Sequence, residues 1–165
     1  MERPQTQDHT HGHLDHVMAT AQVKGKTGAK VFMHEKDLPL YQNLKMQAQL
    51  FGLEADEPIP VDQFLEHEMD IQWSGRKLKT IHTPGHSPGS CCFYIEGKTP
   101  IVFSGDTLFL RSIGRTDLWG GNADQLTRSI KQRLYTLDGD TVVLAGHGPD
   151  TTIASEKRQN PFVSM

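Results

Sequence analysis

The stretch "HTHGHLDHV", residues 9–17, decides how the rest of the chain is interpreted. It places four histidines and one aspartate within eight residues. His11 and His13 are two positions apart, so they diverge on a helix but share a face in an extended segment. The loop that follows can turn Asp15 and His16 toward a second point. The spacing therefore predicts two metal positions rather than one.

Three further metal-competent side chains each follow an apolar run that is predicted to be a strand. "TIHTPGH" ends in His86, "VFSGD" in Asp106 and "VVLAGH" in His147. Ligand sites in α/β sheets gather at such strand ends. These residues bring the number of candidates to seven. A catalytic zinc uses three protein ligands and a water, and two ions about 3.5–4 Å apart that share a carboxylate and a hydroxide would use all seven.

Each of the three strand-end residues also has a purely structural interpretation. A single histidine after a strand is more often a capped or exposed imidazole than a metal ligand, and an aspartate after a glycine is often a turn residue. The histidine-rich stretch favours the metal interpretation for all three together. The remaining histidines lack that support and are predicted to be structural or solvated: His9, His34, His67 and His82.

Composition places the chain among ordinary globular proteins. With 165 residues it fits one domain that can bury about two thirds of its unfolded surface. The net charge of −3 and the lack of a Lys/Arg run argue against a nucleic-acid partner. No apolar run approaches the ~20 residues of a membrane span, and no signal peptide is recognisable. We therefore expect a cytoplasmic protein without a membrane partner.

Short apolar runs alternate with amphipathic segments, which indicates an α/β fold. Asp37 is predicted to cap a helix whose apolar stripe extends from Leu40 to Phe51, and residues 53–69 are predicted to form a loop. Asn122 and Gln125 resemble a capping box. The expected strands are 30–34, two strands within 70–82, 91–95, 100–106 and 141–147; the expected helices lie near 17–24, 37–51, 122–137 and 152–159.

Four segments together resemble the ordered metal motifs of the metallo-β-lactamase superfamily. They are "THGHLDH" (10–16), "TPGHSPGS" (83–90), "FSGDTLF" (103–109) and "GHGPDT" (146–151). The loop "SIGRTDL" and the "GHGP" motif are similar to the short glyoxalase II branch, the hydroxyacylglutathione hydrolases. The resemblance implies an αββα sandwich.

The resemblance also implies a role for each candidate ligand. His11, His13 and His86 would bind the first metal, and Asp106 would bridge both. The second metal would be bound by Asp15, His16 and His147. Asp15 would also orient the metal-bound hydroxide, and Arg115 would contact substrate. The two divalent ions would be zinc, with iron or manganese as alternatives, because imidazole and carboxylate serve all three.

The implied reaction is hydrolysis of a thioester, S-D-lactoylglutathione, to D-lactate and glutathione by a hydroxide that bridges the metals. One alternative is a persulfide dioxygenase-like oxidoreductase of the same superfamily, with one iron on His11, His86 and Asp106. The other is a truncated isoform that binds metal without catalysis.

The sequence departs from the family pattern before the first motif. Family members have several strands and a helix there, about 50 residues, whereas this chain has only "MERPQTQD". These residues are poor strand formers, so residues 1–9 are predicted to be an irregular leader to one domain spanning 1–165. We expect an N-terminally truncated sandwich with an open sheet edge.

Overall fold

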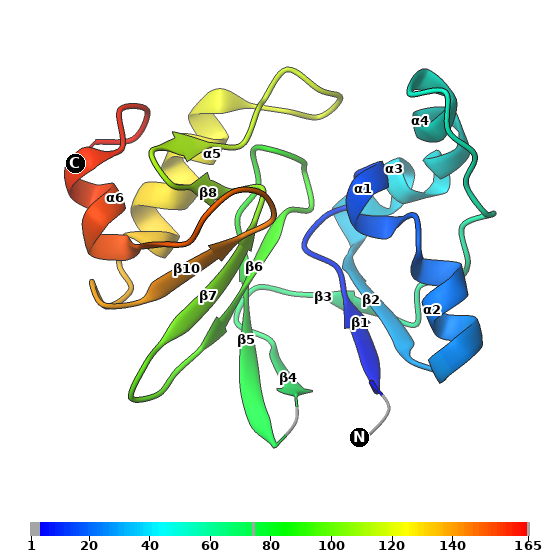
Figure 1. Ribbon diagram of the computed structural model, residues 1–165, viewed down its shortest axis with the longest axis horizontal. Helices are drawn as coiled ribbons and strands as arrows, with labels where there is room; N and C mark the ends of the chain where they lie inside the picture. Colours follow the sequence, from blue (N-terminus) through cyan, green and yellow to red (C-terminus); the bar gives the residue numbers. More distant parts are fainter. Residues whose placement is uncertain (1–3, 74, 165) are drawn as a thin grey trace.

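Two β-sheets face each other and helices cover both outer sides of the pair (Figure 1). The computed structural model describes residues 4–73 and 75–164. The order of layers is helix, three-stranded sheet, six-stranded sheet, helix. This is the αββα sandwich that the resemblance implies.

The first half of the chain forms the smaller sheet and its helices, on the right in Figure 1. Its strands lie in the order β1-β2-β3 and all pair in parallel. The strands are β1 (Thr6–Asp8), β2 (Lys30–His34) and β3 (Gln63–Leu65). The helices are α1 (Leu14–Val17), α2 (Thr20–Thr27), the 3-10 turn η1 (Glu35–Asp37), α3 (Leu38–Gln42) and α4 (Leu44–Leu50).

The second half forms the larger sheet and the other helical layer. The strand order is β11-β10-β7-β6-β5-β4. The strands are β4 (Asp70–Trp73), β5 (Arg76–His82), β6 (Cys91–Ile95), β7 (Ile101–Gly105), β10 (Val142–Ala145) and β11 (Thr151–Thr152). A small hairpin consists of β8 (Leu108–Phe109) and β9 (Ser112–Ile113), and the helices are α5 (Ala123–Ser129), the π-helical turn η2 (Ile130–Leu134) and α6 (Ile153–Gln159).

Three apolar clusters hold these layers together. One, with Phe32, Leu78 and Phe93, fills the space between the two sheets. A second packs the helices of the second half on the larger sheet, and a third packs α1, α3 and α4 on β2. The adjacent Cys91 and Cys92 belong to different clusters, so they point to opposite faces of β6.

Three strands of the larger sheet end at the same edge. β5 and β7 are each antiparallel to β6, and β10 is parallel to β7, so all three run in one direction. His86, Asp106 and His147 follow their carboxyl ends. The prediction that strand ends carry the site residues to one edge is therefore confirmed.

Most predicted elements are present. The strands 30–34 and 91–95 match β2 and β6, and β4 and β5 lie on either side of the Ser74-Gly75 turn, of which Ser74 lies outside the described residues. Gln125 N donates to Asn122 Oδ1 over 2.9 Å, so the N-cap of α5 is confirmed. The reciprocal bond of a capping box is not formed, because Asn122 N donates to Gly85 O.

The prediction of an irregular leader is wrong for Thr6–Asp8. This segment forms β1 because its backbone pairs in register with Lys30–Phe32, a partner that local propensity does not reveal. Within the described residues, β1 is an edge strand of its sheet. The part of the prediction that concerns residues 1–3 lies outside the described residues.

Three further expectations in the first half are corrected. The predicted loop 53–69 contains β3, which pairs with β2. Phe51 does not belong to the buried stripe, since it is 71% exposed after the end of α4. Asp37 precedes α3 but makes no capping bond with its side chain. Its carboxylate instead binds two loops that are distant in sequence.

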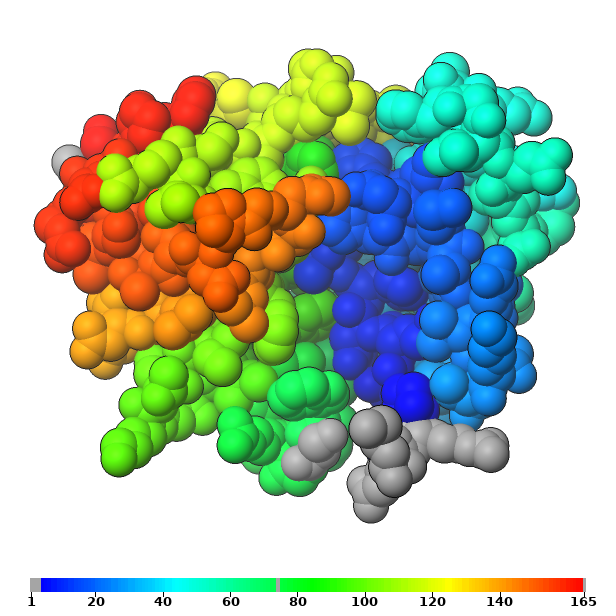
Figure 2. Space-filling model, in the orientation of Figure 1, coloured from blue at the N-terminus to red at the C-terminus, as the bar shows by residue number. Residues whose placement is uncertain are grey.

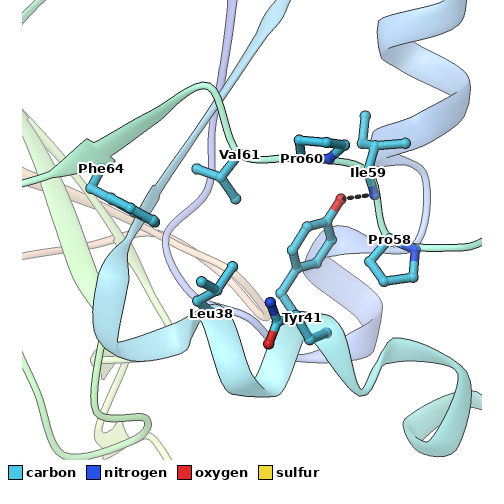
Figure 3. Close-up of a pocket in the computed structure, with 8 residues that line it drawn as sticks. Leu38, Tyr41, Pro58, Ile59, Pro60, Val61 and Phe64 are labelled. Atoms are coloured by element: carbon cyan, nitrogen blue, oxygen red, sulfur yellow. Dashed lines mark hydrogen bonds between the residues drawn. The ribbon is translucent and has the colours of Figure 1, made fainter.

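An apolar pocket of about 370 Å³ lies between α3 and the segment 58–61 (Figure 3). Ile59 N donates to Tyr41 Oη over 3.1 Å. None of the seven predicted metal ligands lines it. The pocket region therefore anchors α3 and does not belong to the metal centre.

No helix in the described part of the chain is long and apolar enough to cross a membrane. The cytoplasmic location stays a prediction.

Candidate metal centre

The seven predicted ligands come from both halves of the sandwich. Four lie in the loop after β1 and at the start of α1, and three follow β5, β7 and β10. In Figure 2 the orange segment that contains β10 and the loop after it lies against the blue N-terminal segment. The ligand atoms fall into overlapping groups within 4.8 Å: His11, His13 and His86; His11, His16 and Asp106; Asp15, His16 and His147.

The first group is buried between the layers. His86 Nε2 lies 2.9 Å from His13 Nδ1 and 3.2 Å from His11 Nε2. The three residues are 1 to 8% exposed. Nitrogens bound to one tetrahedral zinc at 2.0–2.1 Å lie about 3.3 Å apart, so the observed spacing suits a common ion.

A backbone carbonyl fixes the orientation of His86. Its Nδ1 lies 2.8 Å from Arg115 O. A carbonyl only accepts, so Nδ1 carries the proton and Nε2 presents its lone pair to the other histidines. Such contacts orient the imidazole ligands of metal sites.

The second group lies at the rim of the same edge. Asp15 Oδ2 is 2.9 Å from His147 Nε2 and 3.4 Å from His16 Nε2. The side chains of Asp15 and His147 are more than half exposed, whereas that of His16 is 16% exposed. This group is open to solvent.

Asp106 stands between the two groups. Its Oδ2 is 3.7 Å from both His86 Nε2 and His147 Nε2, and its Oδ1 is 3.3 Å from His16 Nε2. A side chain at Gly146 would place a carbon 2.5 Å from Asp106 Oδ1, so this close approach requires glycine.

The pKa values of His11, His13 and Asp106 favour cation binding, whereas that of His16 favours its protonated form. Burial, followed by the charges of neighbouring histidines, lowers the pKa of His11 well below 6.5 and that of His13 to about 4. Burial alone would raise the pKa of Asp106, but contact with His16 and nearby histidine charges outweigh it and keep the pKa low. Burial opposes protonation of His16, yet its contact with Asp106 raises its pKa. Neutral imidazoles and an ionised carboxylate are the ligand forms that metals need.

Several buried polar atoms of the centre have no hydrogen-bond partner within the described part of the chain. They are His16 Nε2 and Asp106 Oδ1, which approach each other to 3.3 Å without forming a hydrogen bond. His13 Nε2 is also unpaired, but it is the ring nitrogen opposite the Nδ1 that faces His86. Buried polar atoms are nearly always paired. The convergent nitrogens of the first group and the unpaired atoms of His16 and Asp106 show that these residues fit a bound metal.

The histidines that were predicted to be structural lie outside the three ligand groups. His9 Nε2 contacts Thr20 Oγ1, and His34 stacks on His82 with ring centroids 4.0 Å apart. His67 has a side chain 40% exposed. Each of these positions agrees with a structural or solvated residue.

The structure gives Arg115 two contacts that the sequence did not suggest. Its carbonyl orients His86, and its exposed guanidinium forms two 2.7 Å hydrogen bonds with Asp117. A role in substrate binding stays a prediction. Asp37 was also missed as a contributor to the site, because an aspartate before a helix is normally interpreted as a cap.

The comparisons with known proteins identify the family of the chain. Residues 9–147 match the metallo-beta-lactamase superfamily, and the chain belongs to that superfamily. It is 42% identical over 157 residues to hydroxyacylglutathione hydrolase GloC of Haemophilus influenzae. The alignment covers 94% of this chain and 74% of that protein.

Solved structures of similar proteins agree with this family. A di-iron-bound form of TTHA1623 is 43% identical, with a TM-score of 0.83, and covers 93% of this chain and 74% of that one. The B3 metallo-beta-lactamase BLEG-1 is 37% identical, with a TM-score of 0.85, and covers 94% and 75%. The chain thus spans about three quarters of the length of these relatives.

Proposed function

We propose that the protein is a two-metal thioester hydrolase that acts on S-D-lactoylglutathione or a similar glutathione thioester. The observation that carries the proposal is the pair of adjacent ligand groups with Asp106 between them. The name of the GloC relative, a hydroxyacylglutathione hydrolase, supports the choice of substrate class.

The proposed ligands divide as the distances suggest. His11, His13 and His86 would hold the first ion, and Asp106 would contribute an oxygen to each position. Asp15, His16 and His147 would hold the second ion. When bound, such ions lower the pKa of water to about 7 and polarise a carbonyl oxygen. We infer zinc, with iron or manganese as alternatives, because the same ligands serve all three.

The side chains around the two positions would guide the reaction, in which water adds to the thioester carbonyl and a thiol departs. Asp15 lies on the exposed side of the centre, where its carboxylate would orient the attacking water. A thiolate is a good leaving group, so no dedicated acid is required. Arg115 would bind a substrate carboxylate in exchange for its exposed partner Asp117.

The test is a thioester assay on the purified chain, loaded separately with zinc, iron and manganese and paired with metal quantification. We expect about two metals per chain and hydrolysis of S-D-lactoylglutathione. A folded chain that holds two metals and leaves every glutathione thioester intact would overturn the substrate assignment. A folded chain that binds metal but acts on no substrate would favour the non-catalytic alternative.

The persulfide dioxygenase-like alternative predicts a different result in the same preparation. It requires a single iron per chain and oxygen uptake with glutathione persulfide. The presence of the second ligand group, at Asp15, His16 and His147, favours the two-metal hydrolase. Oxygen uptake with one iron would reverse the choice.

A further inference from the structure

Asp37 is a buried carboxylate that binds both loops of the first ligand group. It is 0% exposed. Its Oδ2 accepts hydrogen bonds from Gly12 N at 2.8 Å and from Ser87 Oγ at 2.6 Å, and its Oδ1 accepts one from Gly89 N at 2.6 Å. A buried carboxylate is strongly unfavourable unless such donors satisfy it.

The donors are placed beside the ligands themselves. Gly12 lies between His11 and His13, and Ser87 directly follows His86. The two loops come from different sheets, since one follows β1 and the other follows β5. Asp37 belongs to neither loop. It reaches them from the segment between β2 and α3, and α3 itself is joined to the segment 58–61 by the hydrogen bond from Ile59 N to Tyr41 Oη (Figure 3).

The glycines of both loops allow this contact. A side chain at Gly12 would place its first carbon 3.0 Å from Asp37 O, and one at Gly89 would place it 2.7 Å from Asp37 Cγ. Real side-chain carbons essentially never come closer than 3.0 Å to such atoms. Both loops therefore need glycine at these two positions to lie this close to Asp37. A further backbone bond, from Cys91 N to Thr10 O at 2.7 Å, joins the same two segments.

We propose that Asp37 is a positioning residue that sets the distance and orientation of the His11–His13 pair relative to His86. It is not counted among the ligands, because it belongs to none of the three ligand groups and its oxygens bind the two loops instead. Its effect is on metal affinity and geometry at the first position. The inference rests on the metal centre of the proposed function but not on the thioester substrate.

The experiment isolates the first position by using His147→Ala as the parent chain, which removes a ligand of the second group. Asp37→Asn then tests the carboxylate. The amide NH₂ of asparagine cannot accept a hydrogen bond, so at least one of the three donors loses its partner. We expect zinc affinity, measured by chelator competition, to fall about 10- to 100-fold, as it does when contacts that orient metal ligands are lost. We also expect the visible absorption bands of bound Co²⁺ to shift.

Glu156→Gln in the same parent is the matched control. Glu156 is also 0% exposed and accepts three hydrogen bonds, from Thr151 Oγ1, Arg111 N and Asn160 Nδ2, but these donors are not adjacent to the first group. We expect the control to lose stability without a change in zinc affinity or in the Co²⁺ spectrum. A merely structural Asp37 would behave as Glu156 does.

Ser87→Ala provides a milder change that removes one donor and leaves the other two in place. We expect a loss of zinc affinity smaller than that of Asp37→Asn, and this variant decides the question if Asp37→Asn does not fold. Parent-like affinity in the folded variants would overturn the inference. A parent chain that binds no metal would overturn both the inference and the proposed metal centre. If the variants change zinc affinity as expected but the unmodified chain hydrolyses no thioester, only the substrate assignment is overturned.

Discussion

The two ligand groups lie in opposite surroundings. His11, His13 and His86 are almost fully buried between the sheets. In the other group, the side chains of Asp15 and His147 are more than half exposed. Buried ligands are held by contacts on every side, whereas exposed ligands lose side-chain entropy when they bind an ion. We therefore expect the proposed first position to bind metal more tightly than the proposed second one.

The largest expected effect follows from His13→Ala, which removes a ligand of the buried group. Loss of a ligand should exceed the 10- to 100-fold effect of losing a contact behind one, so we expect first-position affinity to fall more than about 100-fold. Thioester hydrolysis should fall to background. The measurements are metal content after gel filtration and the thioester assay.

His9→Gln controls for this change, because His9 belongs to the same histidine stretch but lies outside the ligand groups. It should keep both metals. Equal metal loss in the two variants would contradict the assignment of ligands within the stretch.

A smaller effect is expected from His147→Ala, which removes a ligand of the exposed group. Metal content should fall from about two ions per chain to one, with the first position changed by less than about tenfold. Titration with a metal indicator distinguishes this result from loss of both ions. Loss of both would show that the two positions are interdependent rather than graded in strength.

The smallest expected effect is a difference in the pH at which the unmodified protein releases its two metal ions. Only a neutral imidazole binds metal, so protons compete below the pKa of each histidine. Burial lowers the pKa of His13 to about 4. Burial opposes protonation of His16 as well, but its contact with Asp106 raises its pKa above 6.5, so protons compete there at higher pH.

As pH falls from 7.5 to 5, the second ion should therefore leave first, while the first ion stays until the pH nears the range of His13. Metal content after gel filtration at stepped pH measures this order. Simultaneous release, or the reverse order, would contradict the graded strength of the two positions.

The sequence predicted the site more completely than it predicted the layer around it. Spacing within the histidine stretch and the residues after three apolar strands gave all seven side chains that the structure brings together. The prediction succeeded because strand ends that run in one direction meet at one edge. Their binding of metal stays a proposal.

The errors lie where a pairing partner is distant in sequence. Thr6–Asp8 and Gln63–Leu65 are only three residues each, too short for a local strand pattern, yet both pair with β2. Asp37 has the local pattern of a helix cap, but its carboxylate is closer to donors 25, 50 and 52 residues away. A local sequence pattern cannot predict whether a side chain will bind a nearby backbone group or a donor that is distant in sequence.

The side chains available to the centre follow from the sequence alone, because imidazoles and carboxylates can bind metal wherever a fold brings them together. The tertiary structure alone decided which ligands are buried and what holds them. His13 and His86 are 73 residues apart and meet only because two sheets pack face to face. Burial, pKa and the contact with Asp37 follow from that packing, since each depends on neighbours that the chain brings together only when it folds.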